Sequence, residues 1–413
     1  MVAEISPFMA NGTIFAPPSK SAAQRYLICA ALCRGKTIIK NVGNADDINA
    51  TANCLIALGA KINFTGGDAE VIGLSNGEKT VKLDFNESGF AARVILPVAC
   101  ATGASGRYTV SGQLGERLLK TDFSALKNGG ATITGDSFGG RLTVGEYTVN
   151  RADGSQLVSG LLIALAALNG VSKIKLVGES VSEGYILLTL SALEKFGVKT
   201  IFVGDEITVY GGTYKSPKVI AAEGDFSAAA NFLALGAIGG KITVCGLNKN
   251  SKQPDRAVID VLKDFGANIS VGEDCVTAGK SQLKGVEFSC KNNPDLAPIA
   301  AVVGAYAHGE TVIKDTDRLK DKESDRLAAI IKMLGAAGIE TKLNGDTLII
   351  TGGKPRGGVF AAARDHRIVM AEAVLASAAQ GKSVIDHAES VSKSYPEFFG
   401  ALKAAGGDVY EQI

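Results

Sequence analysis

The chain has 413 residues, of which 46% are hydrophobic and 21% are charged, a composition that supplies a large core and excludes a mostly disordered protein. Its 43 basic and 42 acidic side chains leave a formal net charge of +1, which argues against a non-specific nucleic-acid or membrane surface. No uncharged apolar run approaches the roughly 18 residues of a spanning helix, and no secretory signal pattern is present. We therefore expect a cytoplasmic protein of two or three domains.

Helices and strands are predicted to alternate along the whole chain, which is typical of the α/β class. Apolar periodicity predicts helices over residues 21–33, 47–58, 89–100, 155–168, 185–196, 227–238, 255–265, 295–307, 322–334, 366–378 and 396–405. The predicted strands between them include residues 37–41, 141–144, 207–210, 241–245 and 347–351.

A helix-like apolar run that ends in glycine and is followed by a short strand-like stretch occurs six times. The spacing of these glycines is about 70 residues, longer than the periods of solenoids and propellers. Each is expected to adopt the left-handed conformation that ends a helix. Six such repeats favour two domains of three, and residues 214–224 are the best candidate for a crossing between domains. The glycines are Gly59, Gly130, Gly197, Gly266, Gly338 and Gly406.

Two further patterns carry less weight. Seven cysteines are dispersed along the chain, and Cys29 and Cys33 lie one helical turn apart without the partners that a zinc site needs. We expect small buried thiols in a reducing cytosol. Residues 73–77 match the nucleophile-elbow pattern of hydrolases, but they lie in a predicted polar turn and not between a buried strand and a helix, which disfavours a hydrolase.

Six short segments combine a cation or a hydroxyl with a predicted helix start or loop. In the first, Ser19 or Ser21 can cap a helix beside Lys20, where free amides and the helix dipole attract an anion. Arg25 is predicted to share a face with Ser21. The other segments are residues 86–93, 115–117 in a predicted loop, 153–156, 318–326, and 365–367 with the later Lys393.

Each segment alone is explained as well by an ordinary helix cap or a solvated charge run. On the helix predicted over 322–334, Lys322 and Arg326 share a face, and His366 fits capping or core packing as readily as catalysis. Together, however, the segments gather many cations, which requires strongly anionic ligands because crowded like charges repel. Asp295 and Glu323 are the candidates for proton transfer. The cations are Lys20, Arg25, Arg117, Lys322, Arg326, Arg367 and Lys393.

This arrangement resembles the 5-enolpyruvylshikimate-3-phosphate synthases, a family of enolpyruvyl transferases, along essentially the whole chain. The most specific segments are residues 19–25, 322–326 and 365–367, and Lys393 ahead of Pro396. The resemblance implies an inverse α/β barrel of two domains with pseudo-sixfold βαβαββ repeats. Residues 21–223 would form the domain with shikimate 3-phosphate contacts. Residues 1–20 and 224–413 would form the domain with acid–base residues and phosphoenolpyruvate contacts.

The family transfers the enolpyruvyl group of phosphoenolpyruvate to the 5-hydroxyl of shikimate 3-phosphate and releases phosphate, on the route to chorismate and aromatic amino acids. The resemblance implies a monomer that needs no metal or organic cofactor and is a target of glyphosate. Asp295 would be the base and Glu323 the proton donor, assisted by Lys20. The implied shikimate 3-phosphate contacts are Lys20, Ser21, Arg25, Ser155, Gln156, Ser182, Tyr185, Asp295, Arg318 and Lys322. The implied phosphoenolpyruvate contacts are Lys20, Gly89, Arg117, Gln156, Arg326, Arg367 and Lys393.

The sequence departs from the family pattern at several positions. The family usually has Asn-Ala-Gly-Thr at residues 87–90, a serine at Gly154, asparagine in some members at Arg318, and arginine at Lys320. The nearest alternative is the UDP-N-acetylglucosamine enolpyruvyl transferases, which typically have Lys-Asn at residues 20–21 and a cysteine in the loop at 112–117. A catalytically inactive binding protein is the other alternative, and the intact set of acid, base and cations argues against it.

Overall fold

The computed structural model describes residues 1–74 and 78–412. The chain divides into two compact units: unit 1 is Met1–Pro17 with Glu223–Ile413, and unit 2 is Pro18–Ala222. Unit 2 thus begins at Pro18, so that Lys20 lies in unit 2 and not with the C-terminal residues as expected. Three residues of the hydrolase-like pattern, 75–77, lie outside the described residues. Among the helices described, none has the length and apolar character needed to cross a membrane.

Within the described residues each unit contains three four-stranded sheets of one topology. The sheet with the order β10-β11-β13-β12 is representative. Its first two strands are parallel and the other pairs are antiparallel. A helix joins the parallel pair because parallel strands cannot be closed by a tight hairpin, and the result is the βαβαββ unit. Its elements are β10 (Glu146–Asn150), α6 (Ser155–Ala166), β11 (Gly170–Val177), α7 (Glu183–Lys195), β12 (Lys199–Val203) and β13 (Glu206–Gly211).

The other sheets of unit 2 have the orders β6-β7-β9-β8 and β14-β3-β5-β4. Their strands are β3 (Lys36–Lys40), β4 (Lys61–Thr65), β5 (Asp68–Ile72), β6 (Lys79–Asp84), β7 (Ala104–Thr109), β8 (Ala131–Thr134), β9 (Ser137–Gly140) and β14 (Val219–Ala221). The remaining helices of unit 2 are α1 (Lys20–Leu32), α2 (Asp46–Ala57), α3 (Gly89–Ala101), α4 (Leu114–Leu119), α5 (Ser124–Asn128) and the 3-10 helix η1 (Arg151–Asp153).

Unit 1 repeats the same order in the sheets β2-β15-β17-β16, β18-β19-β21-β20 and β22-β23-β1-β24. Its strands are β1 (Val2–Ser6), β2 (Asn11–Phe15), β15 (Lys241–Cys245), β16 (Asn268–Val271), β17 (Cys275–Gly279), β18 (Glu287–Ser289), β19 (Glu310–Lys314), β20 (Thr341–Asn344), β21 (Thr347–Thr351), β22 (Val359–Phe360), β23 (Ser383–Ile385) and β24 (Asp408–Gln412). Its α-helices are α8 (Phe226–Gly239), α9 (Val258–Asp264), α10 (Ala297–Tyr306), α11 (Arg326–Ala336), α12 (His366–Ala378) and α13 (Phe398–Ala404). Its 3-10 helices are η2 (Pro254–Ala257), η3 (Pro294–Leu296), η4 (Thr316–Leu319) and η5 (Ala388–Lys393).

The chain passes twice between the units, and each passage exchanges an equivalent strand. β2 pairs in parallel with β15 of unit 1, but the helix that follows β2 is α1 of unit 2. β14 pairs in parallel with β3 of unit 2, but the helix that follows it is α8 of unit 1. The second passage falls inside residues 214–224. Each unit is therefore completed by a strand whose own helix belongs to the other unit.

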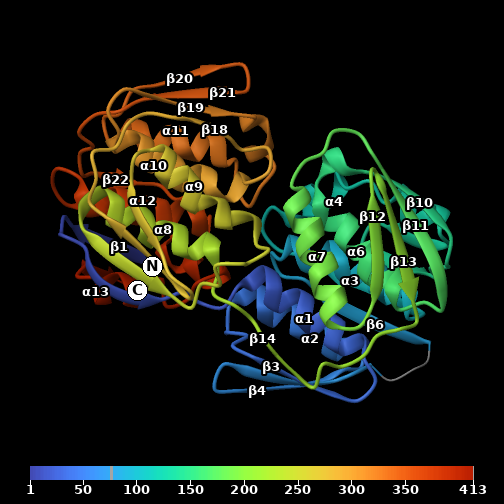
Figure 1. Ribbon diagram of the computed structural model, residues 1–413. Helices are drawn as coiled ribbons and strands as arrows, with labels where there is room; N and C mark the ends of the chain where they lie inside the picture. Colours follow the sequence, from blue (N-terminus) through green and yellow to red (C-terminus); the bar gives the residue numbers. More distant parts are fainter. Residues whose placement is uncertain (75–77, 413) are drawn as a thin grey trace. The chain divides into compact units, whose positions relative to one another are not determined.

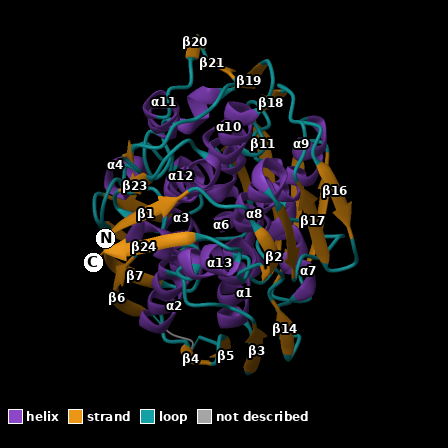
Figure 2. Cartoon of the chain, turned by 90° about the vertical axis from the view of Figure 1, so that its left-hand side faces the viewer, coloured by secondary structure: helices purple, strands orange, loops and turns teal. Residues whose placement is uncertain are grey.

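Three helices of each unit are buried on almost every side: α1, α3 and α6 in unit 2, and α8, α10 and α12 in unit 1. Within each unit, these helices lie toward the inside and most strands toward the outside (Figures 1 and 2). Small residues let the helices approach closely, since a Cβ on Gly160 of α6 would lie 2.3 Å from the carbonyl oxygen of Arg93 in α3. Several candidate residues lie in the first turns of four of these helices: Lys20 and Ser21 in α1, Gly89 in α3, Ser155 and Gln156 in α6, and Arg367 in α12.

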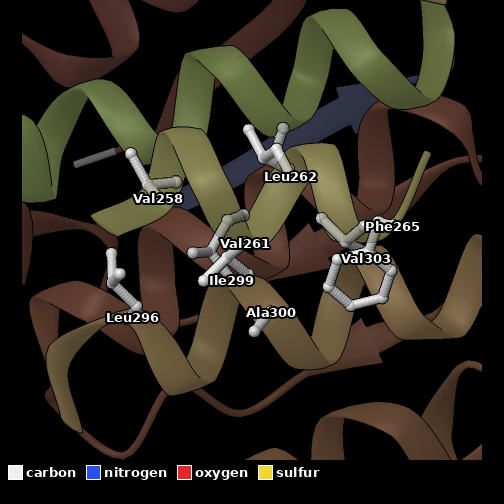
Figure 3. A pocket seen from close by; sticks show the side chains of 9 residues that line it. Val258, Val261, Leu262, Phe265, Leu296, Ile299, Ala300 and Val303 are labelled. Atoms are coloured by element: carbon white, nitrogen blue, oxygen red, sulfur yellow. The ribbon is translucent and has the colours of Figure 1, made fainter. Parts of the chain in front are cut away.

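The core of unit 1 holds one small void between α8, α9 and α10 (Figure 3). Its volume is about 10 Å³, and only apolar side chains line it, among them Val258, Phe265 and Val303. A void of this size barely admits one water molecule, and an apolar lining offers that water no partner. It is therefore a packing defect and not a ligand site.

The repeat glycines behave as predicted. All six have positive φ, from 74° at Gly338 to 99° at Gly59, so the prediction of left-handed helix ends is confirmed.

The predicted strand over 141–144 is wrong, because the amides of Arg141, Leu142 and Thr143 donate to the carbonyls of Gly130, Cys100 and Gly129 instead of joining a strand ladder.

Three further local predictions are corrected. The helix expected over 322–334 begins only at Arg326, because Asp325 caps it: its Oδ1 accepts from the amide of Ala328 at 3.0 Å. An N-cap residue is not itself helical. Residues 115–117 lie in the short helix α4 and not in a loop. The cysteines are not all free thiols, since Cys245 and Cys275 face each other on β15 and β17 and form a disulfide.

Candidate functional site

In unit 2, the first turn of α1 is arranged largely as the sequence predicts. Ser19 is the N-cap, and its Oγ accepts from the amide of Ala22 at 3.4 Å. Lys20 is the first residue of the helix, and its Nζ lies 2.7 Å from Oδ2 of Asp47. The sequence analysis did not single out Asp47, which lies at the start of α2 and is only 9% exposed. The Lys20 ammonium group and a carboxylate that can accept its proton are therefore adjacent at the start of α1.

Arg25 is buried one turn further along α1, with 2% exposure. Its Nε donates to Oγ1 of Thr189 at 2.8 Å, and its two Nη atoms donate to the carbonyls of Ser21 at 2.7 Å and Tyr185 at 3.2 Å. The guanidinium carbon lies 4.5 Å from the ring centroid of Phe90. Because these partners are uncharged, burial lowers the pKa of Arg25 to about 10.

Two hydroxyls stand at other helix starts of unit 2. Ser155 is the first residue of α6 and follows Gly154, whose φ is 111°. Ser182 has φ 53° and precedes α7, and its carbonyl accepts from the amide of Tyr185 at 3.1 Å. Each lies where unpaired helix amides attract an anion.

The starts of α3 and α6 and the end of α4 converge on Arg93. This side chain donates to the carbonyl of Gly89 at 3.3 Å, to Oε1 of Gln156 at 3.1 Å and to the carbonyl of Arg117 at 3.0 Å. A Cβ on Gly89 would lie 3.3 Å from an Nη atom of Arg117, so the Arg117 side chain lies beside the start of α3. Gly89, Arg117 and Gln156 are therefore brought together as expected.

Unit 2 also has a pocket of about 550 Å³ beside α4. Tyr108, Leu118, Phe123 and Lys127 are among its lining residues, and none of the predicted site residues lines it. Part of its wall belongs to α4, the short helix that carries Arg117.

In unit 1, one buried arginine organises the acidic residues. Arg326 is 1% exposed and is the first residue of α11. Its Nη1 lies 2.8 Å from Oδ1 of Asp295, its Nη2 2.5 Å from Oε2 of Glu323, and its Nε 2.7 Å from Oδ2 of Asp365. Burial opposes its charge, but the three carboxylates outweigh burial and hold the pKa of Arg326 well above its usual value. The guanidinium thereby fixes both predicted proton-transfer residues.

Asp295 lies between two arginines. Its second oxygen accepts from Arg367 at 2.6 Å, and it lies in η3 directly ahead of α10. Burial alone would raise the pKa of Asp295, but the charges of Arg367 and Arg326 prevail and hold it below its ordinary range. Asp295 is therefore a carboxylate at neutral pH and can accept a proton.

Lys322 lies in the bend between η4 and α11. Burial lowers its pKa to about 8, against the attraction of Asp295 and with the repulsion of Arg326 and Arg318. Of the cations around Asp295, Lys322 is the one whose charge changes near neutral pH. Arg318 lies in η4, and Lys393 ends η5 and is 7% exposed; η5 packs against α12.

Two carboxylates of unit 1 received no role in the sequence analysis, although Asp365 lies in the segment 365–367 that it singled out. Asp365 caps α12 by accepting from the amide of Arg367 at 2.9 Å, and it also binds Arg326. Asp255 accepts from the hydroxyl of Ser227, and its pKa is raised to about 6, first by burial and then by the negative charge of Asp295. His366, buried at the start of α12, fits the core alternative.

Comparison with known proteins assigns the chain to a family. The model of the EPSP synthase (3-phosphoshikimate 1-carboxyvinyltransferase) family matches residues 7–402. A 3-phosphoshikimate 1-carboxyvinyltransferase of Clostridium kluyveri is 36% identical over 98% of both chains, and one of Methanopyrus kandleri is 33% identical over 97% of both.

Solved structures show the same fold. EPSP synthase of Acinetobacter baumannii aligns with a TM-score of 0.81 and 23% identity, covering 99% of this chain and all of its own. An enolpyruvyl transferase of Streptomyces tendae aligns with a TM-score of 0.79 and 19% identity, covering all of this chain and 98% of its own. The α/β architecture of βαβαββ repeats expected from the sequence is thus confirmed. By its family model and its relatives, the chain belongs to the EPSP synthase (3-phosphoshikimate 1-carboxyvinyltransferase) family.

Proposed function

We propose that the chain transfers the enolpyruvyl group of phosphoenolpyruvate to the 5-hydroxyl of shikimate 3-phosphate, with residues of both units acting in the reaction. Family membership supports the reaction. The assignment of residues rests on the position of Asp295. Its Oδ1 lies 2.8 Å from Nη1 of Arg326, and its Oδ2 lies 2.6 Å from Nη2 of Arg367. The substrates are the only partners the proposal requires, and the protein acts as a cytoplasmic monomer.

Unit 2 is proposed to bind shikimate 3-phosphate. Its 3-phosphate would accept from Ser155 and Ser182 at the starts of α6 and α7, where helix dipoles favour an anion. Lys20, Ser21, Arg25, Gln156 and Tyr185 would hold the remainder of the molecule. Support comes from Arg25, whose buried charge meets only uncharged hydrogen-bond partners among the residues that the structure describes.

Phosphoenolpyruvate is proposed to bind mainly to cationic side chains. Arginine presents two parallel donors, which suit a carboxylate or a phosphate. The assigned residues are Lys20, Gly89, Arg117, Gln156, Arg326, Arg367 and Lys393. Asp295 and Lys322 would reach the hydroxyls of shikimate 3-phosphate, and Arg318 would contact the same substrate.

The chemistry needs one acid and one base. Phosphoenolpyruvate is protonated at its methylene carbon while the 5-hydroxyl loses its proton and attacks C2. Asp295, kept ionised by Arg326 and Arg367, is proposed as the base, and Glu323 as the proton donor. Phosphate then leaves the tetrahedral intermediate while its methyl group returns a proton to Glu323, which restores the carbon–carbon double bond. The cations, Lys20 among them, stabilise the charge of the departing phosphate. Fixing both groups through Arg326 removes the need to orient them during the reaction.

The activity is tested by phosphate release. The protein is mixed with phosphoenolpyruvate and either shikimate 3-phosphate or UDP-N-acetylglucosamine. Phosphate release in the presence of shikimate 3-phosphate, but not of UDP-N-acetylglucosamine, supports the proposal. Release with the nucleotide sugar would assign the chain to the sister reaction, and no release with either would mean an inactive binding protein.

The roles of the two acids are tested by Asp295→Ala and Glu323→Gln, with Asp317→Asn as an exposed acidic control in η4. Each site variant is expected to lose roughly 10²–10⁴-fold in kcat, the usual contribution of general acid or base catalysis. Near-normal turnover in either would remove that residue from its role.

A further inference from the structure

Arg93 contacts three of the residues proposed to bind phosphoenolpyruvate, although neither the family resemblance nor the comparisons assign it a role. It lies in the second turn of α3 and is partly buried. Nη1 donates to the carbonyl of Gly89 at 3.3 Å and to Oε1 of Gln156 at 3.1 Å. Nη2 donates to the carbonyl of Arg117 at 3.0 Å. One guanidinium thus joins the starts of two buried helices to the helix that carries Arg117.

The contact with Gln156 fixes the orientation of its amide. A guanidinium can only donate, so the amide oxygen must be the atom that faces Arg93. The amide nitrogen, with its two donors, is then directed elsewhere. An anionic ligand can accept from that nitrogen but gains nothing from the oxygen. Arg93 therefore holds Gln156 in the one orientation that suits an anion.

The contact with Arg117 stabilises a weak helix. α4 is only six residues long, and isolated helices of this length have little stability of their own. Arg93 Nη2 and Oγ1 of Thr121 both donate to the carbonyl of Arg117, at 3.0 and 3.1 Å, and Arg93 Nε donates to the same hydroxyl at 3.1 Å. This closed set of bonds anchors the end of α4 to α3 and so fixes where the Arg117 side chain begins.

We propose that Arg93 is a positioning residue for phosphoenolpyruvate: it sets the orientation of the Gln156 amide and the position of Arg117 relative to Gly89, without touching the substrate. This inference rests on the proposed function, in which these three residues bind phosphoenolpyruvate.

Arg93→Gln and Arg93→Lys test the proposal. In both variants the KM for phosphoenolpyruvate is expected to rise roughly 10- to 100-fold, as for misplacements of about 1 Å. The KM for shikimate 3-phosphate is expected to rise by less, because Gln156 is proposed to bind both substrates, whereas Gly89 and Arg117 are proposed to bind phosphoenolpyruvate alone. Lysine is not expected to rescue, since a point ammonium cannot make the forked set of bonds. Arg107→Gln, which removes an exposed arginine 75% accessible on β7, is the matched control.

A double-mutant cycle with Gln156→Ala separates positioning from general support of the fold. If Arg93 acts partly through Gln156, the loss of kcat/KM in the double variant is smaller than the product of the single losses. Melting temperatures identify any variant that fails to fold, in which case Arg93→Lys carries the test.

Several outcomes would overturn the role of Arg93: an unchanged KM for phosphoenolpyruvate, equal increases for both substrates, full rescue by lysine, or fully multiplicative losses in the cycle. If the wild-type protein itself released no phosphate from the two substrates, the proposed function would fail. A wild-type protein that works, with Arg93→Gln unchanged, would refute only the inference about Arg93.

Discussion

Each unit buries an arginine almost completely, but the two are balanced in opposite ways. Arg326 of unit 1 is 1% exposed and Arg25 of unit 2 is 2% exposed. Arg326 binds Asp295, Glu323 and Asp365, whereas the hydrogen bonds of Arg25 go to a hydroxyl and two carbonyls. Their pKa values move accordingly, upward for Arg326 and down to about 10 for Arg25.

This difference indicates that the two buried arginines have different roles. A buried charge that meets its counter-charges within the protein holds those carboxylates in place. A buried charge without a carboxylate costs free energy of folding, and such a cost is characteristic of functional sites. We therefore propose that Arg326 fixes the acid and the base of unit 1 and that Arg25 binds an anionic substrate in unit 2.

Removing Arg326 gives the largest expected effect. Arg326→Gln removes the cation that Asp295, Glu323 and Asp365 share, although Asp295 keeps its ion pair with Arg367. The free energy of unfolding is expected to fall by about 3–5 kcal/mol. Turnover is expected to fall to the background rate because both proton-transfer groups lose their anchor. Urea denaturation and phosphate release measure the two effects, with Lys320→Gln, an exposed pair with Asp317, as the control. A loss of stability under about 1 kcal/mol would place Arg326 among ordinary surface ion pairs.

Removing Arg25 should affect binding more than folding. Charge-assisted hydrogen bonds contribute about 1.5–3 kcal/mol, so Arg25→Gln is expected to weaken shikimate 3-phosphate binding roughly 10- to 100-fold. The loss of unfolding free energy should be smaller than for Arg326→Gln, because no carboxylate loses its partner. Lys173→Gln, an exposed pair with Glu206, is the control. If Arg25→Gln bound shikimate 3-phosphate as tightly as the wild type, Arg25 would contribute to the packing of the core and not to binding.

Lys322, in unit 1, adds a prediction about how kcat/KM depends on pH. Its pKa of about 8 means that its charge is lost above that pH, and kcat/KM is expected to fall about tenfold per pH unit there. Unfolding does not explain such a fall: with the folded pKa below the unfolded value of 10.5, the unfolded chain binds more protons, so this group makes stability rise between about pH 8 and 10.5. Lys322→Arg stays cationic, and its profile should fall only at higher pH. If kcat/KM fell at the same pH in the wild type and in Lys322→Arg, Lys322 would not be the group responsible for the fall.

Glu372, in the middle of α12, gives the smallest expected effect. Neither oxygen of its fully buried carboxyl has a hydrogen-bond partner among the described residues, and burial followed by the charge of Asp386 raises its pKa from 4.5 to about 9. The folded state keeps a proton that the unfolded state loses, so this contribution to stability is fully present below about pH 4.5 and is lost as pH rises to about 9.

Glu372→Gln should therefore be within about 1 kcal/mol of wild type near pH 5, where the amide resembles the neutral acid, and more stable than wild type at pH 9. Melting temperatures across this range measure the difference. A wild-type protein and variant with parallel pH profiles would show that Glu372 is not held neutral.

The sequence alone predicted the repeats and the ends of several helices, because these depend on local patterns. The six helix-ending glycines and Ser19 as a cap are examples. Partners that come from elsewhere in the chain were not visible: Asp47 meets Lys20 across 27 residues, and Arg93 meets Gln156 across 63. The cap at Asp325 moved Lys322 off its predicted helix, since a single side-chain hydrogen bond outweighs apolar periodicity there.

The most direct test of the division between the units is calorimetric titration of shikimate 3-phosphate into Arg25→Gln and Glu323→Gln, with phosphate release measured on the same samples. We predict that Glu323→Gln binds like the wild type, within about threefold, yet releases almost no phosphate, whereas Arg25→Gln binds at least about tenfold more weakly. Equal weakening of binding in both variants, or normal phosphate release from Glu323→Gln, would contradict the account.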